Sequence, residues 1–463
     1  MSAETQMTGT SEARNRRWRW AVHVVLGLVV FAVALAINFS HVETTELHPD
    51  ETRWLNRAYY FDDFFDPFGP TWQDYYLTRG QPPGGSYLMG LGLWLQGLPR
   101  DSVGVWDFNY GLTWVRGEEP GWNELAGATP SDDVLFGGRR TNAVVGALVA
   151  VLIYAVATQL TNPIGGLVAG LVLANHPLQI TLSTQALSDE LLALCLGITF
   201  VAAYQFARRP NYGWAITMGI AIGVGGGTKL APLALSFVLA GYGLVWLIWL
   251  WWTNRHMRLT WSNRKFGLLL LAQPVIAGVT FVAMYPYLWV SPIVNALHLL
   301  DFRRTEMASQ ARILPHARVD DPLGAFLRFG QQLEGAYSST RDAITSLGDL
   351  LGRDFSGAQS FDLLLGAVGV VLVLRMVIQF GLWSPQALVI LLMAAEVGAV
   401  TVGLGVDFYR YYLPVLLVVC VLIGVTAGET ARVLGNFVRP RPVPETEAPA
   451  SDIAGGSESV ATS

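Results

Sequence analysis

The sequence predicts an all-α polytopic membrane protein with about ten transmembrane helices, on three observations. Only 14% of the 463 residues are charged and 52% are hydrophobic, whereas about 25% of the residues in a soluble domain are charged. Apolar stretches of about 20 residues, the length that crosses a bilayer core, recur along the chain. Basic residues also concentrate in alternate connections between those stretches, as the positive-inside bias of multi-pass proteins requires.

The first apolar stretch runs from about Trp20 to Phe39, directly after an arginine-rich segment at 14–19. Ala34-Leu35-Ala36 resembles a signal-peptidase site, but the stretch is long enough to span and many more spans follow. We therefore expect a retained transmembrane helix. The further apolar stretches lie near 141–160, 163–181, 191–207, 213–228, 230–252, 266–290, 361–380, 384–405 and 411–428.

Two long polar loops, at 40–138 and 291–360, interrupt this series of spans. We expect residues 1–430 to form one transmembrane domain that includes both loops. The remaining segment, 431–463, is rich in Pro, Ser, Glu and Ala. This composition is typical of disordered segments, so we expect a disordered cytoplasmic tail.

The apolar stretch from Gln81 to Pro99 is the ambiguous one. Prolines bracket a short segment that is diluted by glycines, which suits an interfacial helix better than a span. If this segment does not cross, the arginines at 14–19 share one side with the basic clusters at 208–209, 255–265, 375 and 432–441. That side is then the cytoplasm, both termini lie in it, and both long loops lie on the outer face of the plasma membrane.

The sequence lacks the features that are typical of several functional classes. The net charge is −5 and there is no basic stripe, which argues against nucleic-acid binding. No P-loop, dinucleotide fingerprint or HExxH motif is present. The only cysteines, Cys195 and Cys420, fall in apolar stretches, where we expect inert packing residues.

Two acidic motifs lie where apolar stretches meet the expected outer face. Asp50-Glu51 follows Pro49 shortly after the first span, and Asp189 lies in Ser188-Asp189-Glu190 at the start of another. Charge at a lipid–water boundary is costly unless it acts on something. Such carboxylates could deprotonate a hydroxyl or bind a cation. The alternative for both motifs is a helix cap, in which Asp50 would cap while Glu51 points elsewhere.

Basic residues on the same side are further candidates, because they run against the positive-inside bias. Lys229 follows a glycine run at 225–227, Arg410 stands among tyrosines, and Arg139-Arg140 lies at the start of the second span. Lysine and arginine at membrane level could hold a phosphate. The alternatives are a snorkelling lysine and an aromatic belt at the interface.

Together these residues support one chemistry. Outer carboxylates could activate an acceptor hydroxyl by general-base catalysis, while the outer lysine and arginines could stabilise a departing phosphate. A phosphate at that depth suggests a lipid-linked one. We therefore expect one outward cavity to collect four side chains: Asp50, Asp189, Lys229 and Arg410.

The chain resembles the GT-C superfamily of integral-membrane glycosyltransferases, most closely the protein O-mannosyltransferase and aminoarabinose-transferase-like group. The resemblance covers residues 15–430. It rests on the order and common side of short motifs: His48-Pro49-Asp50-Glu51 with Trp54, Gln81-Pro82-Pro83, Pro177 with Ser183 and Asp189, Thr228-Lys229, and Arg410-Tyr411-Tyr412-Leu413-Pro414. Gln81 departs from the pattern, since Lys-Pro-Pro or His-Pro-Pro is more usual, and the loop at 100–138 resembles an insertion.

The resemblance implies an inverting glycosyltransferase that moves a sugar from a polyprenyl-phosphate carrier to a protein, lipid or glycan acceptor on the outer face. Asp50 would be the general base with Glu51 as its neighbour in the motif, and Asp189 would help to position the acceptor or a cation. Lys229 and Arg410 would hold the donor phosphate. From their position on the same side, we add Arg139, Arg140 and Tyr411 to the expected phosphate group.

No cofactor is expected to be required, and a divalent cation is allowed for but not favoured, since family members differ in metal dependence. A lipid-linked sugar flippase or transporter would use the same charges as a translocation path, but Glu396 is the only clear mid-span carboxylate. An outer-face polymerase or ligase of preassembled lipid-linked glycans is another alternative. A non-catalytic scaffold would tolerate substitution of Asp50, Asp189 and Lys229 together.

Overall fold

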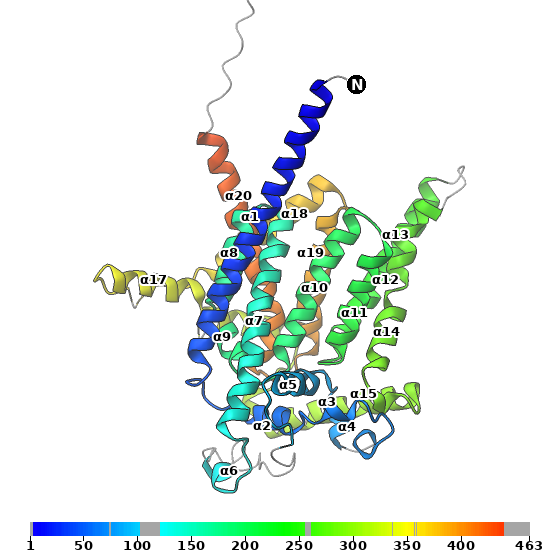
Figure 1. Cartoon of the computed structure of the whole chain (residues 1–463), viewed down its shortest axis with the longest axis vertical. Helices are drawn as coiled ribbons and strands as arrows, with labels where there is room; N and C mark the ends of the chain where they lie inside the picture. The colour runs from blue at the N-terminus through cyan, green and yellow to red at the C-terminus, as the bar shows by residue number, and fades with distance from the viewer. Residues whose placement is uncertain are drawn as a thin grey trace, which may run out of the picture.

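A computed structural model shows a bundle of long helices with a layer of short helices across one end (Figure 1). The structure describes residues 3–73, 76–101, 121–254, 261–335, 337–355, 357 and 359–438. Within these ranges the regular structure is helical, apart from one isolated bridge between Arg318 and Val406. The predicted all-α fold is confirmed.

Eight helices of the described chain are long and apolar enough to cross a membrane. They are α1 (Ala3–His41), α7 (Asp132–Leu160), α10 (Asp189–Arg208), α12 (Leu233–Thr253), α13 (Trp261–Leu271) continued by α14 (Gln273–Ala283), α18 (Asp362–Phe380), α19 (Pro385–Gly403) and α20 (Leu413–Val438). A ninth span is present if α8 (Pro163–Ala174) and α9 (Pro177–Ser183), which meet at 64°, are counted as one. α11 (Tyr212–Gly226) is a shorter apolar helix, so each predicted stretch forms a helix.

The shorter helices come mainly from the two long loops. In chain order they are α2 (Pro49–Asn56), α3 (Tyr60–Asp63), η1 (Pro70–Trp72), α4 (Tyr76–Gly80), α5 (Gly84–Leu95), α6 (Gly121–Leu125), η3 (Pro286–Leu288), α15 (Pro292–Ile313), η4 (Pro315–Ala317), α16 (Pro322–Glu334), α17 (Ser339–Leu350) and η5 (Tyr409–Tyr412). α5 has 12 residues and lies across the end of the bundle, as an interfacial helix would (Figure 1). α15 lies against α4, with Arg303 donating to the Gly80 carbonyl (3.0 Å), so the two loops meet at one end.

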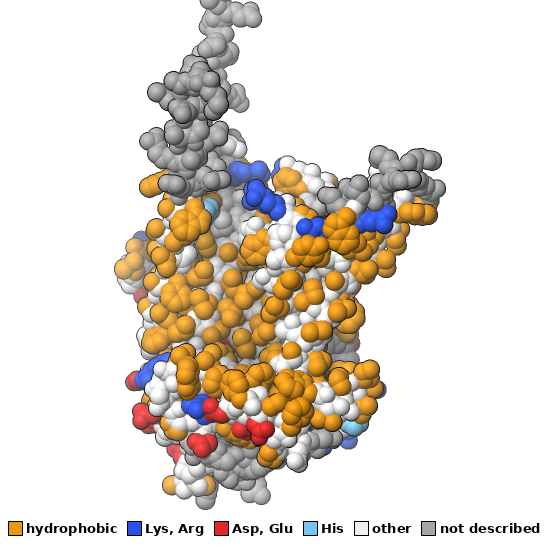
Figure 2. All heavy atoms as spheres, turned by 45° about the vertical axis from the view of Figure 1, so that its right-hand side comes forward, with side chains coloured by type: hydrophobic (Ala, Val, Ile, Leu, Met, Phe, Trp, Pro, Cys, Tyr) orange, Lys and Arg blue, Asp and Glu red, His pale blue; other side chains and the backbone are white. Residues whose placement is uncertain are grey.

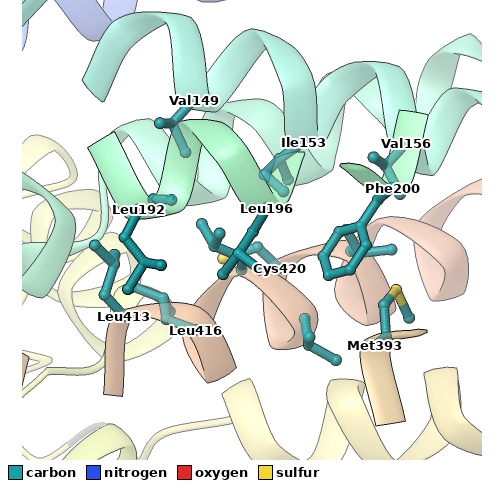
Figure 3. Close-up of a cluster of buried hydrophobic side chains, with 14 of the residues drawn as sticks. Val149, Ile153, Val156, Leu192, Leu196, Phe200, Met393, Leu413, Leu416 and Cys420 are labelled. Atoms are coloured by element: carbon teal, nitrogen blue, oxygen red, sulfur yellow. The ribbon is translucent and has the colours of Figure 1, made fainter. Parts of the chain in front are cut away.

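The core lies where α7, α10, α19 and α20 meet (Figure 3). α20 is its central helix, because 89% of its apolar window is buried, and a helix that is apolar all round belongs inside a bundle. Close crossing depends on small residues. A Cβ at Gly165 of α8 would stand 2.6 Å from the Gly424 carbonyl oxygen of α20. Cys195 and Cys420 are buried free cysteines of these spans.

The surface of the bundle is divided into three zones (Figure 2). On the face that Figure 2 shows, hydrophobic side chains cover the middle, lysine and arginine gather towards the end opposite the short helices, and acidic side chains gather at the end that carries the short helices. An apolar zone of this kind is the surface that lipid covers. The division follows the charge bias read from the sequence.

Most of the predicted tail and part of the predicted insertion lie outside the described residues. α20 ends at Val438, ten residues past the predicted end of the last span at 428. The predicted disordered tail therefore lies mostly at 439–463, outside the described residues, as does the part of the predicted insertion at 102–120.

Candidate active site

The first acidic motif begins α2 through a capping box. His48 is the N-cap residue with an extended backbone (φ −85°, ψ 131°), and its Nδ1 accepts a hydrogen bond from the Asp50 N–H (3.1 Å). The Glu51 carboxylate in turn accepts a hydrogen bond from the His48 N–H (2.8 Å). Pro49 at the first helical position suits this start. Glu51 therefore takes the capping role, in contrast to the helix-cap alternative in which Asp50 would cap, and Asp50 is left to act elsewhere.

Glu51 forms a fully buried ion pair with Arg139 of α7. The guanidinium contacts both carboxylate oxygens, from Nε to Oε1 (2.8 Å) and from Nη2 to Oε2 (2.9 Å). The side chains are 0% and 2% exposed for Glu51 and Arg139. Glu51 Oε1 also accepts the Ala186 N–H (2.7 Å). This pair ties the first loop to α7 and to the turn before α10.

The remaining donors of Arg139 are used in the same way. Nη1 donates to the carbonyls of Val42 (2.9 Å) and Thr45 (2.7 Å), and Nη2 donates to that of Glu46 (3.2 Å). A guanidinium has five N–H donors, so none is left for the phosphate expected at Arg139. Arg140 is exposed and is not among the residues that line the cavities described below. The geometry thus separates both arginines from the predicted phosphate group.

Asp50 pairs instead with Arg410, from the 3₁₀ turn η5 that precedes α20. Their side chains are 14% and 16% exposed. Burial alone would raise the pKa of the Asp50 carboxyl, but the Arg410 guanidinium and, with smaller effects, His48 and Arg53 hold that pKa below its usual value. Asp50 is therefore ionised near neutral pH.

Asp189 begins α10 and pairs with Lys229, which follows α11. The Asp189 side chain is 1% exposed, and its second oxygen, Oδ2, is buried with no hydrogen-bond partner among the described residues. The Tyr411 ring stands beside both cations, with Lys229 Nζ 4.8 Å and the Arg410 guanidinium carbon 5.6 Å from the ring centroid. The two ion pairs are thus brought next to each other.

Two glycines at the start of α5 hold these motifs together. The Gly84 N–H donates to the Gly227 carbonyl (2.8 Å), and a Cβ at Gly84 would stand 2.6 Å from that oxygen. A Cβ at Gly85 would stand 2.5 Å from the Ser188 Cβ and 2.7 Å from the Trp54 ring. Only glycine permits this close approach. The segment after Gln81-Pro82-Pro83 therefore locks the Lys229 turn, the Asp189 turn and α2 into one unit.

An apolar cavity of about 280 Å³ opens beside the Asp189–Lys229 pair. Its walls come from α10, the turn between α11 and α12, the end of α19 and the start of α20, through Leu192, Leu230, Val400, Leu404 and Pro414. Asp189, Lys229 and Arg410 line the same cavity. Glu396, the mid-span carboxylate, lies in its wall and is 1% exposed.

A polar cavity of about 380 Å³ lies on the other side of Arg410. Asp50, Arg53 and Tyr76 line it from the first loop, and one face of α15 lines it from the second. Gln81, Arg303, Arg410 and Tyr411 belong to both cavities. The four side chains predicted to converge therefore lie around the junction of two cavities, with Asp50 on the polar side and Asp189 and Lys229 on the apolar side.

Sequence reasoning missed the contribution of α15. Arg303, Glu306, Gln310 and Ile313 line the polar cavity, and their spacing of three or four residues puts them on one face of a helix. Arg303 donates to Glu306 (2.6 Å). The periodic spacing of these residues in the loop at 291–360 was the available signal. Among the described residues, no group of three or more His, Cys, Asp or Glu side chains is placed to hold a metal ion.

The model of one protein family matches the chain. The family is described as dolichyl-phosphate-mannose-protein mannosyltransferase, and the match covers residues 21–288, more than half of the chain. No curated protein matches.

Several solved structures match parts of the chain. The oligosaccharyltransferase of Archaeoglobus fulgidus, tethered to an acceptor peptide, is 11% identical over 90% of this chain and 50% of its own, with a TM-score of 0.49. The protein O-mannosyltransferase Pmt1-Pmt2 complex of S. cerevisiae, bound to the sugar donor, is 17% identical over 58% and 34%, with a TM-score of 0.41. ArnT from Cupriavidus metallidurans is 17% identical over 86% and 59%, with a TM-score of 0.47. The chain thus spans less than two thirds of the length of each.

Proposed function

The chain belongs to the dolichyl-phosphate-mannose-protein mannosyltransferase family of GT-C membrane glycosyltransferases, and from this premise we propose that it transfers a sugar from a polyprenyl-phosphate carrier. The acceptor is a hydroxyl or amine of a protein, lipid or glycan, and the transfer inverts the anomeric carbon. It takes place at the outer face of the membrane. The single observation that carries the proposal is that an apolar and a polar cavity meet at the Asp50–Arg410 pair.

The apolar cavity suits the lipid-linked donor. Its walls are made of side chains from membrane helices, which accept isoprenoid units without loss of hydrogen bonds. Lys229 and Arg410 line it, and they would hold the phosphate as a point charge and as a planar fork. The sugar would then project past Tyr411 towards Asp50.

Donor binding would change the partners of both ion pairs. In the structure Asp50 is held by Arg410 and Asp189 by Lys229. A phosphate that draws Arg410 away removes the strongest influence that lowers the pKa of Asp50, so that carboxylate becomes a stronger base once the donor is in place. The site would thereby be activated by its own substrate.

The proposed step is a single displacement. The acceptor O–H or N–H gives its proton to Asp50 as the acceptor atom bonds to the anomeric carbon, and the bond from that carbon to the phosphate oxygen breaks. Lys229 and Arg410 stabilise the negative charge that gathers on the departing polyprenyl phosphate. The acceptor would lie in the polar cavity, against Arg53, Tyr76 and α15. The divided surface charge supports placing this end outside the cell (Figure 2).

The test is turnover by the purified full-length protein, given a polyprenyl-phosphate sugar and followed for release of polyprenyl phosphate. Asp50→Asn should lower the rate by about 10²–10⁴-fold, the usual contribution of a general base. Asp62→Asn is the matched control, because Asp62 pairs with Arg100 at a half-exposed site outside both cavities. Near-normal turnover of Asp50→Asn would refute the proposed mechanism.

A further inference from the structure

Arg57 is a buried cation that the mechanism above does not use. It follows α2, is 0% exposed, and is one of the two arginines among the largest fully buried side chains. The other, Arg139, has the Glu51 carboxylate as its partner. Within the described residues, Arg57 is bonded only to Gln81 and lies over the rings of Trp54 (5.4 Å) and Tyr60 (4.7 Å).

A buried guanidinium without a carboxylate is energetically expensive. Aromatic faces and an amide offset part of the cost. Three of the carboxylates that line the cavities are ion-paired with other cations, in the pairs Asp50–Arg410, Asp189–Lys229 and Glu306–Arg303. The fourth, Glu396, lies on α19, and within the described residues it forms no ion pair with Arg57. Arg57 therefore leaves a buried positive charge behind Gln81, which an anionic ligand in the cavities would offset.

Gln81 connects this charge to the cavities. Arg57 Nη1 donates to the Gln81 side-chain oxygen Oε1 (2.9 Å), and Nη2 donates to the Gln81 carbonyl (3.2 Å). A guanidinium only donates hydrogen bonds, so the side-chain oxygen of Gln81 has to face it. The amide nitrogen Nε2 then faces away from Arg57. Gln81 lines both cavities, and across the described part of the chain no hydrogen bond occupies its Nε2.

We propose that Arg57 and Gln81 form a charge relay for the phosphate of the lipid carrier. Gln81 Nε2 donates a hydrogen bond to a phosphate oxygen, beside Lys229 and Arg410. Arg57 is a positioning residue, which fixes the amide in the donating orientation and supplies a charge that the phosphate offsets. This inference rests on the proposed function, since it assigns a new part of the same donor site.

The charge balance favours phosphate over the sugar as the partner of the relay. A sugar-linked phosphodiester carries a negative charge, which would offset part of the charge of Arg57 as well as bind Lys229 and Arg410. A sugar hydroxyl would satisfy Nε2 but would leave Arg57 uncompensated. The phosphate also gains negative charge as the carrier departs, so the relay favours the transition state as well as the bound donor.

The test measures binding to the full-length protein in nanodiscs of zwitterionic lipid. The probes are a polyprenyl phosphate, the same polyprenol without phosphate, inorganic phosphate, and an anionic phospholipid. Arg57→Met and Gln81→Leu should each weaken polyprenyl phosphate about tenfold, which corresponds to about 1.4 kcal/mol, and should leave polyprenol unchanged. Arg100→Met, which removes a surface arginine paired with Asp62, is the matched control and should bind like wild type.

A rescue experiment separates the relay from a merely structural role. In the double variant Arg57→Met/Gln81→Lys the cation stands directly at the cavity, so polyprenyl phosphate should again bind to within about threefold of wild type, which is a difference of under about 0.7 kcal/mol. Gln81→Leu keeps Arg57 in place, so it tests the relay even if the variants that lack Arg57 misfold.

Each outcome decides the proposal. Unchanged affinity in Arg57→Met and Gln81→Leu, an equal loss for polyprenol, or failure of Gln81→Lys to rescue would overturn the relay while leaving the proposed function standing. If Arg57→Met weakened the binding of inorganic phosphate or of the anionic phospholipid more than that of polyprenyl phosphate, the lipid carrier would be excluded as the ligand of the relay. Failure of wild type to bind polyprenyl phosphate would refute the proposed function itself, and the relay with it.

Discussion

Asp50 and Glu51 are neighbours in the chain, yet they belong to two different regions of the molecule. Glu51 lies in the buried junction of the first loop with α7, where Arg139 and two backbone N–H groups bind both of its oxygens. Asp50 lines the polar cavity and is bound to Arg410, which lines both cavities. The first region is closed and the second is open to a ligand.

The difference lies in unused hydrogen-bonding capacity rather than in charge. Arg139 donates all five of its N–H groups to protein atoms, so none is left for a ligand. Its pair with Glu51 therefore stabilises the structure. In the open region, Arg410 and Lys229 lie on cavity walls and Asp189 keeps an oxygen without a partner. Ion pairs of similar composition can therefore serve stability in one place and chemistry in another.

The largest effect is expected in the closed region. Arg139→Met should destabilise the protein by about 3–5 kcal/mol, because it leaves the Glu51 charge buried without its partner. The neighbouring Arg140→Met is the matched control, since Arg140 is exposed, and surface substitutions usually change stability by under about 0.5 kcal/mol. Thermal unfolding in detergent measures both. Equal stability of the two variants would remove the distinction between the regions.

In the open region, removal of a cation should weaken binding of the donor rather than lower the stability of the fold. Arg410→Met should raise the KM for the donor at least about tenfold, the equivalent of about 1.4 kcal/mol. It should also move the acid limb of the kcat/KM profile, which reports the free enzyme, to higher pH, because Arg410 is the main group that lowers the pKa of Asp50 before the donor binds. Steady-state rates across pH 4–8 measure both effects. An unchanged acid limb would contradict the coupling of Asp50 to Arg410.

His48, which links the two regions, should give a smaller, pH-dependent effect. Burial, as the largest influence, holds its pKa below the usual 6.5, against the opposing charge of Asp50. Its contribution to stability is therefore complete above pH 6.5 and is lost as the pH falls through the folded-state pKa, at no more than about 1.4 kcal/mol per pH unit. His48→Asn should flatten this decline in unfolding measurements between pH 7 and pH 5. If stability fell equally with pH in wild type and in His48→Asn, the decline would belong to another titratable group.

The smallest effect is expected from metal removal. Both acids of the open region are bound to basic side chains, so we expect chelation by EDTA to leave the initial rate unchanged. The comparison is the rate after EDTA treatment with and without added Mg²⁺ or Mn²⁺. A loss of activity that either metal restores would contradict this expectation and would call for a cation between Asp50 and Asp189.

The sequence was sufficient for the helices and for the proximity of Asp50, Asp189, Lys229 and Arg410, although these four lie around two cavities rather than in the one expected. It was wrong to add Arg139 and Arg140 to that group, since neither lines these cavities. Spans follow from apolar length, and the charge bias correctly put the two loops at one end of the bundle. It was not sufficient for the roles of Glu51 and Arg139, because a pattern of charges does not reveal which donors are already used. Arg57 escaped attention for the same reason, since its importance lies in the absence of a carboxylate partner within the described fold.

The most direct test of the account compares Asp50→Asn with Glu51→Gln in single-turnover transfer from a saturating polyprenyl-phosphate sugar, with each rate normalised to the folded fraction of protein. The account predicts that Asp50→Asn loses about 10²–10⁴ in rate while remaining as stable as wild type. It predicts that Glu51→Gln is less stable but transfers sugar at a rate close to that of wild type per folded molecule. Equal rates in the two variants, or a greater loss in Glu51→Gln, would contradict the assignment of Asp50 as the base.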